Sequence, residues 1–302
     1  MSVVIVGSIA LDTVQTPVET HTDMLGGSAS YASVAASFFA PVKLVGVVGT
    51  DFPKKFTNLL RKRGIDLAGL QVAEGKTFRW SGVYEWDYNT RRTVSVALNV
   101  FERFNPTLPA NYATAPFVML GNIHPSLQHR VLDQMRRPKF VLCDTMDLWI
   151  KTAKPDLMKL LKRVDALCLN DSEARQLTGQ TSLIKAGRAL LGMGPKFAVI
   201  KKGEHGALLF SNGDFFSAPA YPLEDLHDPT GAGDCFAGAL IGYVARAGRA
   251  TPAVLRRAIV HGSVVASYDV ESFSLNRLER LRPADITRRY AEFIRLSHFH
   301  TP

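Results

Sequence analysis

Residues 227–238 read His227-Asp228-Pro229-Thr230-Gly231-Ala232-Gly233-Asp234-Cys235-Phe236-Ala237-Gly238, and an apolar run continues to Val244. A polar turn with two glycines therefore leads into an apolar helix. The start of a helix presents backbone N–H groups without partners inside the helix, together with the positive end of the helix dipole. This geometry binds anions, phosphate above all. Because glycine has no Cβ atom, the backbone can approach such a ligand closely.

Asp234 is the unusual residue of this turn. A carboxylate beside a phosphate site repels the phosphate, so we expect it to have a chemical task. That task is to accept a proton from a hydroxyl group that attacks the phosphate. The competing interpretation is a helix cap, since aspartate is common there and short glycine turns are widespread. The string Asp228–Asp234 is much longer than a lone Gly-x-Gly pattern, which favours the catalytic interpretation.

Composition limits the class of protein. The chain has 302 residues, 46% of them hydrophobic, enough for one large α/β domain or two small ones. Its three cysteines form no Cys-x-x-Cys pair, which argues against a zinc site and suits a reducing cytoplasm. The first residues lack the basic region and length of a signal peptide, and no apolar run approaches membrane-spanning length. We therefore expect a cytoplasmic protein with no membrane partner.

The net charge of +9 comes from basic pairs and triplets spread over the whole chain. Proteins that bind nucleic acids usually concentrate their positive charge on one face. The chain also lacks zinc-finger, RNP and helix-turn-helix patterns. We therefore expect no nucleic-acid partner, and we interpret the charge as solvated helix faces with a general attraction for anionic nucleotides.

Apolar strands alternate with helices along most of the chain. The predicted strands are residues 3–7, 43–49, 117–121, 140–144, 166–170, 197–200 and 206–210. The predicted helices are residues 28–39, 51–63, 126–136, 155–163, 172–178 and 183–193, with three more from about 233, 252 and 283. Such alternation predicts a mainly parallel sheet that is covered by helices on both faces.

Residues 76–104 interrupt this alternation. Phe78, Trp80 and Tyr84 alternate with polar neighbours, residues 87–92 form a polar turn, and a second alternating run follows. Period-two alternation on both sides of a turn predicts an antiparallel hairpin. A small sheet above a ligand edge is a candidate lid, to which about residues 13–23 add another strand. The alternatives are a structural excursion or a dimer surface.

Several polar residues follow predicted strands. Asp12 comes after the first strand, Asp144 ends another, Asn170 and Glu173 follow a third, and the run 202–206 follows a fourth. Each alone would serve as a helix cap or a turn. Their common position at one edge of an open α/β sheet, where ligands bind, predicts a site.

These motifs together resemble the ribokinase, or PfkB, family of sugar and nucleoside kinases over nearly the whole chain. The matching motifs are Asp12, Gly26-Gly27, Gly46–Asp51, the 76–104 hairpin, Asn170 with Glu173, and Asp228–Asp234. The resemblance implies one ribokinase-like domain over residues 1–302. Its fold would be a three-layer α/β/α arrangement with a mainly parallel central sheet and a small β-sheet lid.

The resemblance also implies an ATP- and Mg²⁺-dependent kinase and a role for each matching residue. Asp234 would be the base, and the amides of Gly231, Ala232 and Gly233 would form the anion hole. The implied substrate-binding residues are Asp12, Gly26, Gly27, Ser28 and Tyr31. The implied nucleotide-binding residues are Asn170, Lys202, Gly203, Gly206, Gly231 and Gly233. Asn170 and Glu173 would organise Mg²⁺ through water, and Asp228 and Thr230 match positions that bind a monovalent cation such as K⁺ in some members.

Two departures from the family pattern leave the substrate and the monovalent cation open. Tyr31 stands where many sugar-binding members have asparagine, and residues 270–274 lack the usual glycine-alanine pair. We favour a ribonucleoside, adenosine-like, because aromatic residues of the lid such as Phe78 and Trp80 can stack on a base. Those rings would equally well pack in the lid's own core. A free-sugar kinase for ribose, fructose or 2-keto-3-deoxygluconate is the alternative.

Other classes fit less well. The chain has no Gly-x4-Gly-Lys-Ser/Thr motif and no protein-kinase signature. It also lacks the third glycine of the dinucleotide fingerprint at the required spacing. A ligand-binding protein without catalysis remains the rival from another class, although it would not need Asp234, Asn170 and Glu173. A homodimer formed through the lid is a further expectation.

Overall fold

The computed structural model describes residues 1–88 and 90–298. Asn89, which belongs to the predicted hairpin turn, lies outside the described residues.

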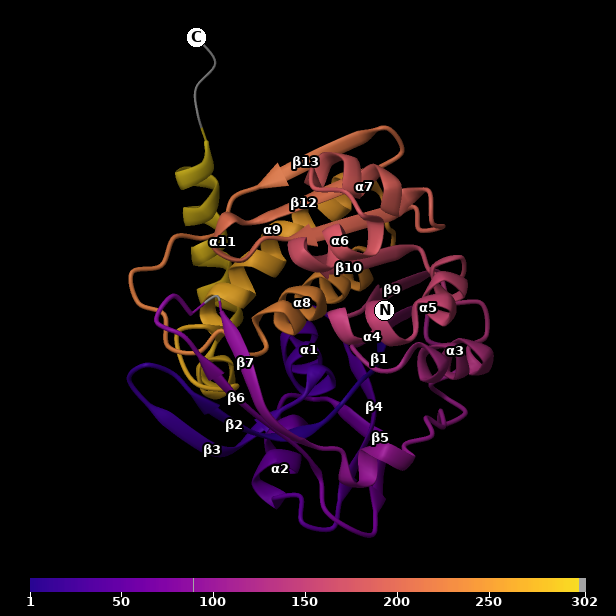
Figure 1. The fold of residues 1–302 in the computed structure, drawn as a ribbon, viewed down its shortest axis with the longest axis vertical. Helices are drawn as coiled ribbons and strands as arrows, with labels where there is room; N and C mark the ends of the chain where they lie inside the picture. Colours follow the sequence, from indigo (N-terminus) through magenta and orange to yellow (C-terminus); the bar gives the residue numbers. More distant parts are fainter. Residues whose placement is uncertain (89, 299–302) are drawn as a thin grey trace.

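The apolar runs form a nine-stranded sheet through the middle of the molecule, in the order β13-β12-β11-β10-β9-β8-β1-β4-β5 (Figure 1). Seven neighbouring strands, from β11 to β5, are parallel, and β12 and β13 run antiparallel at one edge. The strands are β1 (Val3–Val6), β4 (Val42–Gly49), β5 (Asp66–Ala73), β8 (Phe117–Leu120), β9 (Phe140–Asp144), β10 (Ala166–Asn170), β11 (Phe197–Lys201), β12 (Ala207–Ser211) and β13 (Asp214–Ala218).

Successive side chains of each central strand enter cores on opposite faces of the sheet. In β1, Val3 and Ile5 pack on one face, and Val4 and Val6 pack on the other. The first face is covered by α1 (Ser28–Ser37), α2 (Lys54–Lys62), α8 (Ala232–Ala247), α9 (Pro252–Asp269), α10 (Asn276–Arg280) and α11 (Pro283–Ser297). The second is covered by α3 (Pro125–Gln134), α4 (Asp147–Thr152), α5 (Lys154–Leu161), α6 (Asp171–Thr178) and α7 (Leu183–Leu191). This arrangement explains why the strands are apolar on both faces.

Helix α8 lies closely against α1 because glycines face it. A Cβ atom on Gly238 would lie 2.3 Å from the carbonyl oxygen of Ala32, and one on Gly242 would lie 2.8 Å from that of Ala36. Neither approach is compatible with a side chain. The close packing fixes α8, and with it the Asp234 end of the helix, over the sheet.

A second, four-stranded sheet lies beside the main body, at the lower left of Figure 1. Its order is β3 (Thr20–Gly26), β2 (Ala10–Gln15), β6 (Phe78–Tyr84) and β7 (Arg91–Ala97). Only the β2–β6 pair is parallel. The N-terminal segment therefore supplies two strands of this sheet, and Asp12 lies within β2. The predicted α/β fold, with a mainly parallel sheet covered on both faces and a smaller second sheet, is confirmed.

Five elements were missing from the sequence prediction: β5, β13, α4, α10 and one of the two strands β2 and β3, which replace the single strand predicted over about residues 13–23 because the chain turns back between them. Two short 3-10 helices, η1 (Asn99–Arg103) and η2 (Gly203–His205), also occur. Within residues 1–88 and 90–298, no helix combines the length and apolar character needed to cross a bilayer.

Candidate active site

Three neighbouring strands bring polar residues to one place at the carboxyl edge of the main sheet. Asp144, Asn170 and Lys201 are the last residues of β9, β10 and β11. In each strand the residues two and four positions earlier pack in the core beneath α8. Because side chains alternate along a strand, all three terminal residues are on the α8 side. The sequence therefore directs a carboxylate, an amide and an ammonium group towards the start of α8.

Lys201 and Asp144 form an ion pair, with Nζ and Oδ2 separated by 3.2 Å. The side chains are only 17% and 5% exposed. Burial raises the pKa of Asp144, and Lys201 lowers it. Burial alone would lower the pKa of Lys201, but Asp144 and the other surrounding acidic groups outweigh it, so the net pKa is raised. The ammonium group therefore stays charged at neutral pH.

The turn before α8 requires glycine at Gly231, which has φ +86°. This left-handed conformation is unfavourable for other residues. A Cβ atom there would also lie 2.3 Å from the ring of Tyr31, so the buried tyrosine ring packs directly on the turn. The ring thus supports the backbone of the predicted anion hole. The N–H of Ala232 donates to the carbonyl of Pro229 at 3.3 Å.

Asp234 lies in the first turn of α8 and is partly buried. The net pKa of Asp234 is raised to about 7: burial raises it most, Asp144 also raises it, and Lys201 and Arg91 lower it. A carboxylate with this pKa can take a proton near neutral pH and release it again. Arg91 belongs to β7, so the second sheet contributes a positive charge to this site.

Asp12 lies next to the glycine pair. Its Oδ2 would be 1.9 Å from a Cβ atom on Gly26, so only glycine fits at that position. The carboxylate is buried, and Oδ1 has no partner within the described residues. Burial raises the pKa of Asp12 to about 8, with further contributions from Asp228 and Asp234. An unsatisfied buried carboxylate oxygen points to a ligand that would supply the missing hydrogen bond.

Gly27 and Ser28 stabilise this region from within the chain. Gly27 has φ +91° and lies against the carbonyl of Ser8. The Ser28 hydroxyl accepts from the N–H of Ser8 at 3.2 Å, and the N–H of Ser28 donates to the Ser8 hydroxyl at 3.1 Å. These reciprocal bonds join the end of β1 to the start of α1.

Asn170 and Glu173 form a capping box at the start of α6. The Asn170 side chain accepts from the N–H of Glu173 at 2.8 Å, and Glu173 Oε2 accepts from the N–H of Asn170 at 2.7 Å. The net pKa of Glu173 is raised to about 7, because burial and Asp144 raise it by more than Lys201 lowers it. The donor set consists of hard oxygen atoms in a region rich in carboxylates. It therefore fits Mg²⁺, which retains most of its water ligands.

Asp228 holds the turn before α8 in place. Its carboxylate is fully buried, and both oxygens already accept backbone N–H bonds, from Thr230 at 2.9 Å and from Ser274 at 3.2 Å. The Thr230 hydroxyl bonds to that of Tyr84 at 3.2 Å, which joins β6 to the turn. Asp228 and Thr230 therefore tie the turn to residue 274 and to the second sheet.

A cavity of about 520 Å³ extends from this edge along the α8–α9 side. Asn170, Lys201, Gly203, Gly206 and Gly233 line it together with apolar residues of α8 and α9. Asp87 and Tyr88, from the second sheet's hairpin turn, line it too. Lys202 is not among its lining residues, although the motif comparison had placed that lysine at the nucleotide.

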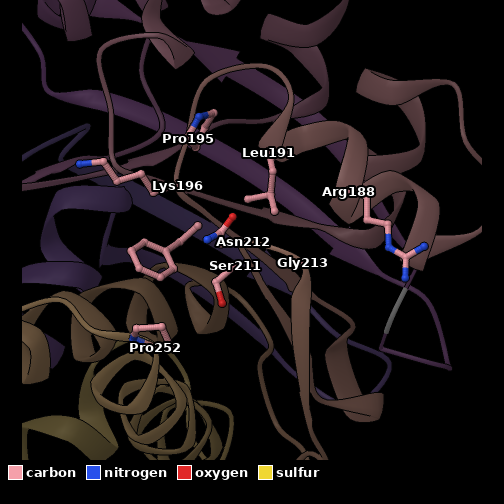
Figure 2. A pocket seen from close by; sticks show the side chains of 9 residues that line it. Arg188, Leu191, Pro195, Lys196, Ser211, Asn212, Gly213 and Pro252 are labelled. Carbon is pink, nitrogen blue, oxygen red and sulfur yellow. The ribbon is translucent and has the colours of Figure 1, made fainter.

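A larger hollow of about 620 Å³ lies at the opposite edge of the sheet. It is lined from α7, the start of β11, the β12–β13 turn and the start of α9. Figure 2 shows that the charged ends of Arg188 and Lys196 lie on opposite outer sides of it. No set of charges converges on this hollow, so its size does not make it the stronger candidate.

Two contributors to the site, Lys201 and Arg91, were not predicted from the sequence. Asp144 was among the polar strand ends that predicted a site, but no role was given to it. The signal was present in the strand period, because Phe197, Val199 and Lys201 share one face of β11. Arg91 gave no signal, because its contribution depends on how the second sheet docks.

Comparisons with known proteins agree with this geometry. A model of the pfkB family of carbohydrate kinases matches residues 2–277. The chain is 32% identical over 256 residues to a cytidine kinase of Thermococcus kodakarensis, covering 80% of this chain and 88% of that protein. Aminoimidazole riboside kinase from Salmonella enterica, solved with aminoimidazole riboside and an ATP analogue, has a TM-score of 0.76 at 18% identity, over 96% and 100% of the two chains. Thermotoga maritima ribokinase gives 0.76 at 18% identity, over 96% and 99%. These likenesses confirm the predicted ribokinase-like fold.

Proposed function

The chain belongs to the pfkB family of carbohydrate kinases, and from that premise we propose that it transfers the γ-phosphoryl group of ATP to the primary hydroxyl of a ribonucleoside. Family membership makes it a phosphotransferase that acts on a nucleoside or sugar hydroxyl. The observation that carries the finer proposal is Asp234, a carboxylate with a raised pKa beside a glycine turn and a nucleotide-sized cavity. A protein that only binds its ligand has no need of a base at this position.

In the proposed reaction, Asp234 takes the proton of the acceptor hydroxyl. The hydroxyl oxygen forms a bond to the γ-phosphorus, the bond from that phosphorus to the bridging oxygen breaks, and the electron pair leaves with ADP. The N–H groups of Gly231 and Gly233 stabilise the charge on the phosphoryl oxygens, and that of Ala232 joins them when it leaves the carbonyl of Pro229. Asp12 positions the acceptor, because its unsatisfied oxygen can bond a sugar hydroxyl.

The donor nucleotide occupies the cavity beside α8 in this proposal. Asn170 and Glu173 are the residues that would hold Mg²⁺ through water, and the ion would neutralise charge on the transferred phosphates. Gly203 and Gly206 line the same cavity and permit close approach of the nucleotide. Asp228 and Thr230 are the residues that would hold a monovalent cation such as K⁺, and no step of the proposed reaction depends on it.

The proposed acceptor is a ribonucleoside. The 32% identical relative is a cytidine kinase, and the Salmonella neighbour was solved with a riboside. This support favours the nucleoside class without favouring adenosine within it. The aromatic lid residues give less support than the sequence suggested, because Phe78 stacks on Phe101 at 5.3 Å and Trp80 packs near Tyr84. A free-sugar acceptor is the second candidate, favoured by the similarity of the fold to ribokinase.

ATP consumption with Mg²⁺ should be measured across cytidine, adenosine, inosine, ribose, fructose and 2-keto-3-deoxygluconate. We expect the highest kcat/KM with one of the nucleosides. A free sugar turned over far faster than every nucleoside would overturn the acceptor class and leave the kinase assignment standing. Nucleotide binding without turnover of any acceptor would favour a non-catalytic ligand-binding protein.

We also propose that the second sheet, about residues 13–23 and 76–104 of a single 1–302 kinase domain, acts as a lid. The Tyr84–Thr230 bond and the hairpin turn at the cavity support this role. Closure would exclude water, which competes with the acceptor for the phosphoryl group. Hydrogen exchange in β6 and β7 should slow when the acceptor binds, and unchanged protection would count against the lid.

The outer strand of this sheet is the proposed contact for a second copy of the chain. Val94, Val96 and Leu98 are all exposed there. Light scattering should detect a dimer that Val96→Asp dissociates. A monomeric wild-type protein would contradict this interface.

The three buried, free cysteines support the cytoplasm as the compartment.

A further inference from the structure

We propose that Lys201 binds the terminal phosphates of the donor nucleotide and that Asp144 is its partner when the site is empty. The inference rests on the proposed function, since it takes the cavity beside α8 as the donor site. The family motif pointed to Lys202, the next residue along the chain. The geometry of β11 points to Lys201 instead.

Lys201 lies directly beneath the glycine turn. It shares a strand face with Phe197 and Val199, which pack in the core under α8. A Cβ atom on Gly233 would lie only 3.1 Å from Lys201 Nζ. The same side chain lines the cavity. The ammonium group therefore lies between the floor of the cavity and the first turn of the helix.

This arrangement places two positive groups close together. The N-terminal end of α8 carries a partial positive charge, and the Lys201 ammonium carries a full one. Two positive groups in a poorly solvated region repel each other unless an anion lies near both. Asp144 offsets the charge from the sheet side, at 3.2 Å. A phosphate entering from the cavity would contact the turn and the ammonium group together.

The two members of the ion pair should have opposite effects on nucleotide affinity. Lys201 attracts a phosphate, whereas the nearby Asp144 carboxylate repels it and competes for the same ammonium group. A pair with a purely structural role predicts the same effect for both, because losing either partner leaves an unpaired buried charge. The sign of the Asp144 effect therefore distinguishes the two roles.

The variants are Lys201→Met, Lys201→Arg, Lys202→Met, Asp144→Asn and the double variant Lys201→Met with Asp144→Asn. Lys196→Met is the matched control, since Lys196 precedes the other end of β11 and pairs with Asp165 at 2.8 Å. Calorimetric titration uses an imido-bridged, non-hydrolysable ATP analogue with excess Mg²⁺. AMP is the comparison ligand because it lacks the terminal phosphates.

Lys201→Met should weaken binding of the analogue about 10–100-fold, the range of one charge-assisted hydrogen bond, and leave AMP affinity within about twofold. Lys201→Arg should restore most of the loss because it keeps a cation there. Asp144→Asn should bind the analogue at least as tightly as the wild type. Lys196→Met should bind both ligands normally.

Equal losses in Lys201→Met and Asp144→Asn would overturn the proposal, as would a loss confined to Lys202→Met. The double variant protects the test against misfolding, because it leaves no unpaired buried charge, and it must show the same loss for the analogue. Acceptor turnover is not needed. A wild type that binds the analogue but phosphorylates no acceptor would refute the proposed function while still testing Lys201, and one that does not bind it would overturn both.

Discussion

Strand β11 has a lysine–aspartate ion pair at each end, and the two pairs differ in their surroundings. At the amino end, Nζ of Lys196 lies 2.8 Å from Asp165, and the lysine is 75% exposed. At the carboxyl end, Lys201 lies 3.2 Å from Asp144, and both side chains are largely buried. An exposed pair contributes about 0–1 kcal/mol, whereas losing one partner of a buried pair costs about 3–5 kcal/mol. Loss of one partner of the Lys201–Asp144 pair is therefore expected to destabilise the protein more, although its N–O distance is longer, because this pair is buried.

The two hollows beside these ion pairs also differ in their surroundings more than in their size. The hollow at the amino edge is larger, about 620 Å³ against about 520 Å³, yet its charged side chains diverge (Figure 2). At the carboxyl edge, the smaller cavity is lined by the start of α8, by Asn170 at the end of β10 and by the buried Lys201, which is paired with Asp144. The convergence of charged groups, more than the volume of a cavity, identifies the edge of the sheet that carries the candidate active site.

Changing one carboxylate at each edge should give the largest contrast. Asp234→Asn should lower kcat about 10²–10⁴-fold, since the amide cannot accept the proton. Nucleotide binding should persist because the fold and the glycine turn remain. Asp165→Asn, at the amino edge, should leave kcat unchanged. Steady-state kinetics with the best acceptor measures both, and near-normal kcat in Asp234→Asn would remove this residue from the mechanism.

Two glycines with the same backbone conformation allow a second comparison. Gly231 has φ +86° at the carboxyl edge, and Gly213 has φ +85° in the β12–β13 turn. A Cβ atom on Gly213 meets nothing within 4 Å, whereas one on Gly231 would lie 2.3 Å from the Tyr31 ring. Gly213→Ala should therefore cost only the backbone strain, about 1–2 kcal/mol.

Gly231→Ala adds a steric clash to the same strain. Either the turn or the Tyr31 ring must move, and a displacement of about 1 Å at reacting groups can cost about 10²-fold in rate. We expect kcat/KM to fall by about that factor in Gly231→Ala and to stay normal in Gly213→Ala. Equal activity in the two variants would show that the Gly231 turn has only a structural role.

Much of the main sheet could be predicted because its strands are apolar on both faces and end in turns. Two edge strands could not. Strand β5 is mostly half-exposed, and Gly69 interrupts its apolar residues so that the chain can approach the carbonyl of Leu44. Strand β13 is mostly exposed and therefore has no apolar run. Edge strands gain their stability from pairing with a neighbour, which a local pattern does not record.

The candidate site was predictable where a motif is continuous and less so where contacts join distant segments. The Asp228–Asp234 string located the helix start directly. Ser28, in contrast, bonds to Ser8, and that long-range contact is invisible in the sequence. Which of Lys201 and Lys202 faces the site depends on which face of β11 each residue occupies. That is known only when the strand is packed against its neighbours.

The carboxyl edge should also make stability depend on pH. Burial raises the pKa of Asp12 to about 8 and that of Asp234 to about 7, against 3.8 for an ordinary aspartate. Between the ordinary pKa of 3.8 and the raised values of about 7 and 8, the folded state binds more protons than the unfolded state. The stability from these groups is therefore fully present below about pH 4 and is lost as the pH rises towards 8.

Thermal unfolding of the ligand-free protein at a series of pH values tests this sign. Each pKa unit corresponds to about 1.4 kcal/mol, and each kcal/mol shifts Tm by about 2–4 °C. Tm should therefore fall by more than about 10 °C between pH 5 and pH 8. Asp12→Asn and Asp234→Asn should each flatten the decrease. Lys196→Met should not, because Asp165 raises the pKa of Lys196 and that group titrates at alkaline pH. A Tm that rises over this interval would contradict the assignment.

The smallest effect is expected from Lys196→Met itself. The lysine is largely exposed, and Asp165 keeps a second bond, since it accepts from the N–H of Val141 at 3.0 Å. Stability should fall by at most about 1 kcal/mol at low salt, and the difference from wild type should vanish in about 1 M NaCl, where exposed charges are screened within about 3 Å. The stability loss in Lys201→Met should persist in salt, because a buried pair is screened much less. Thermal melts and kcat/KM measurements on both variants test whether Lys196 affects stability or activity. A loss of activity in Lys196→Met would mean that the amino-edge hollow takes part in function. The divergence of its charged side chains would then not exclude that hollow as a functional site.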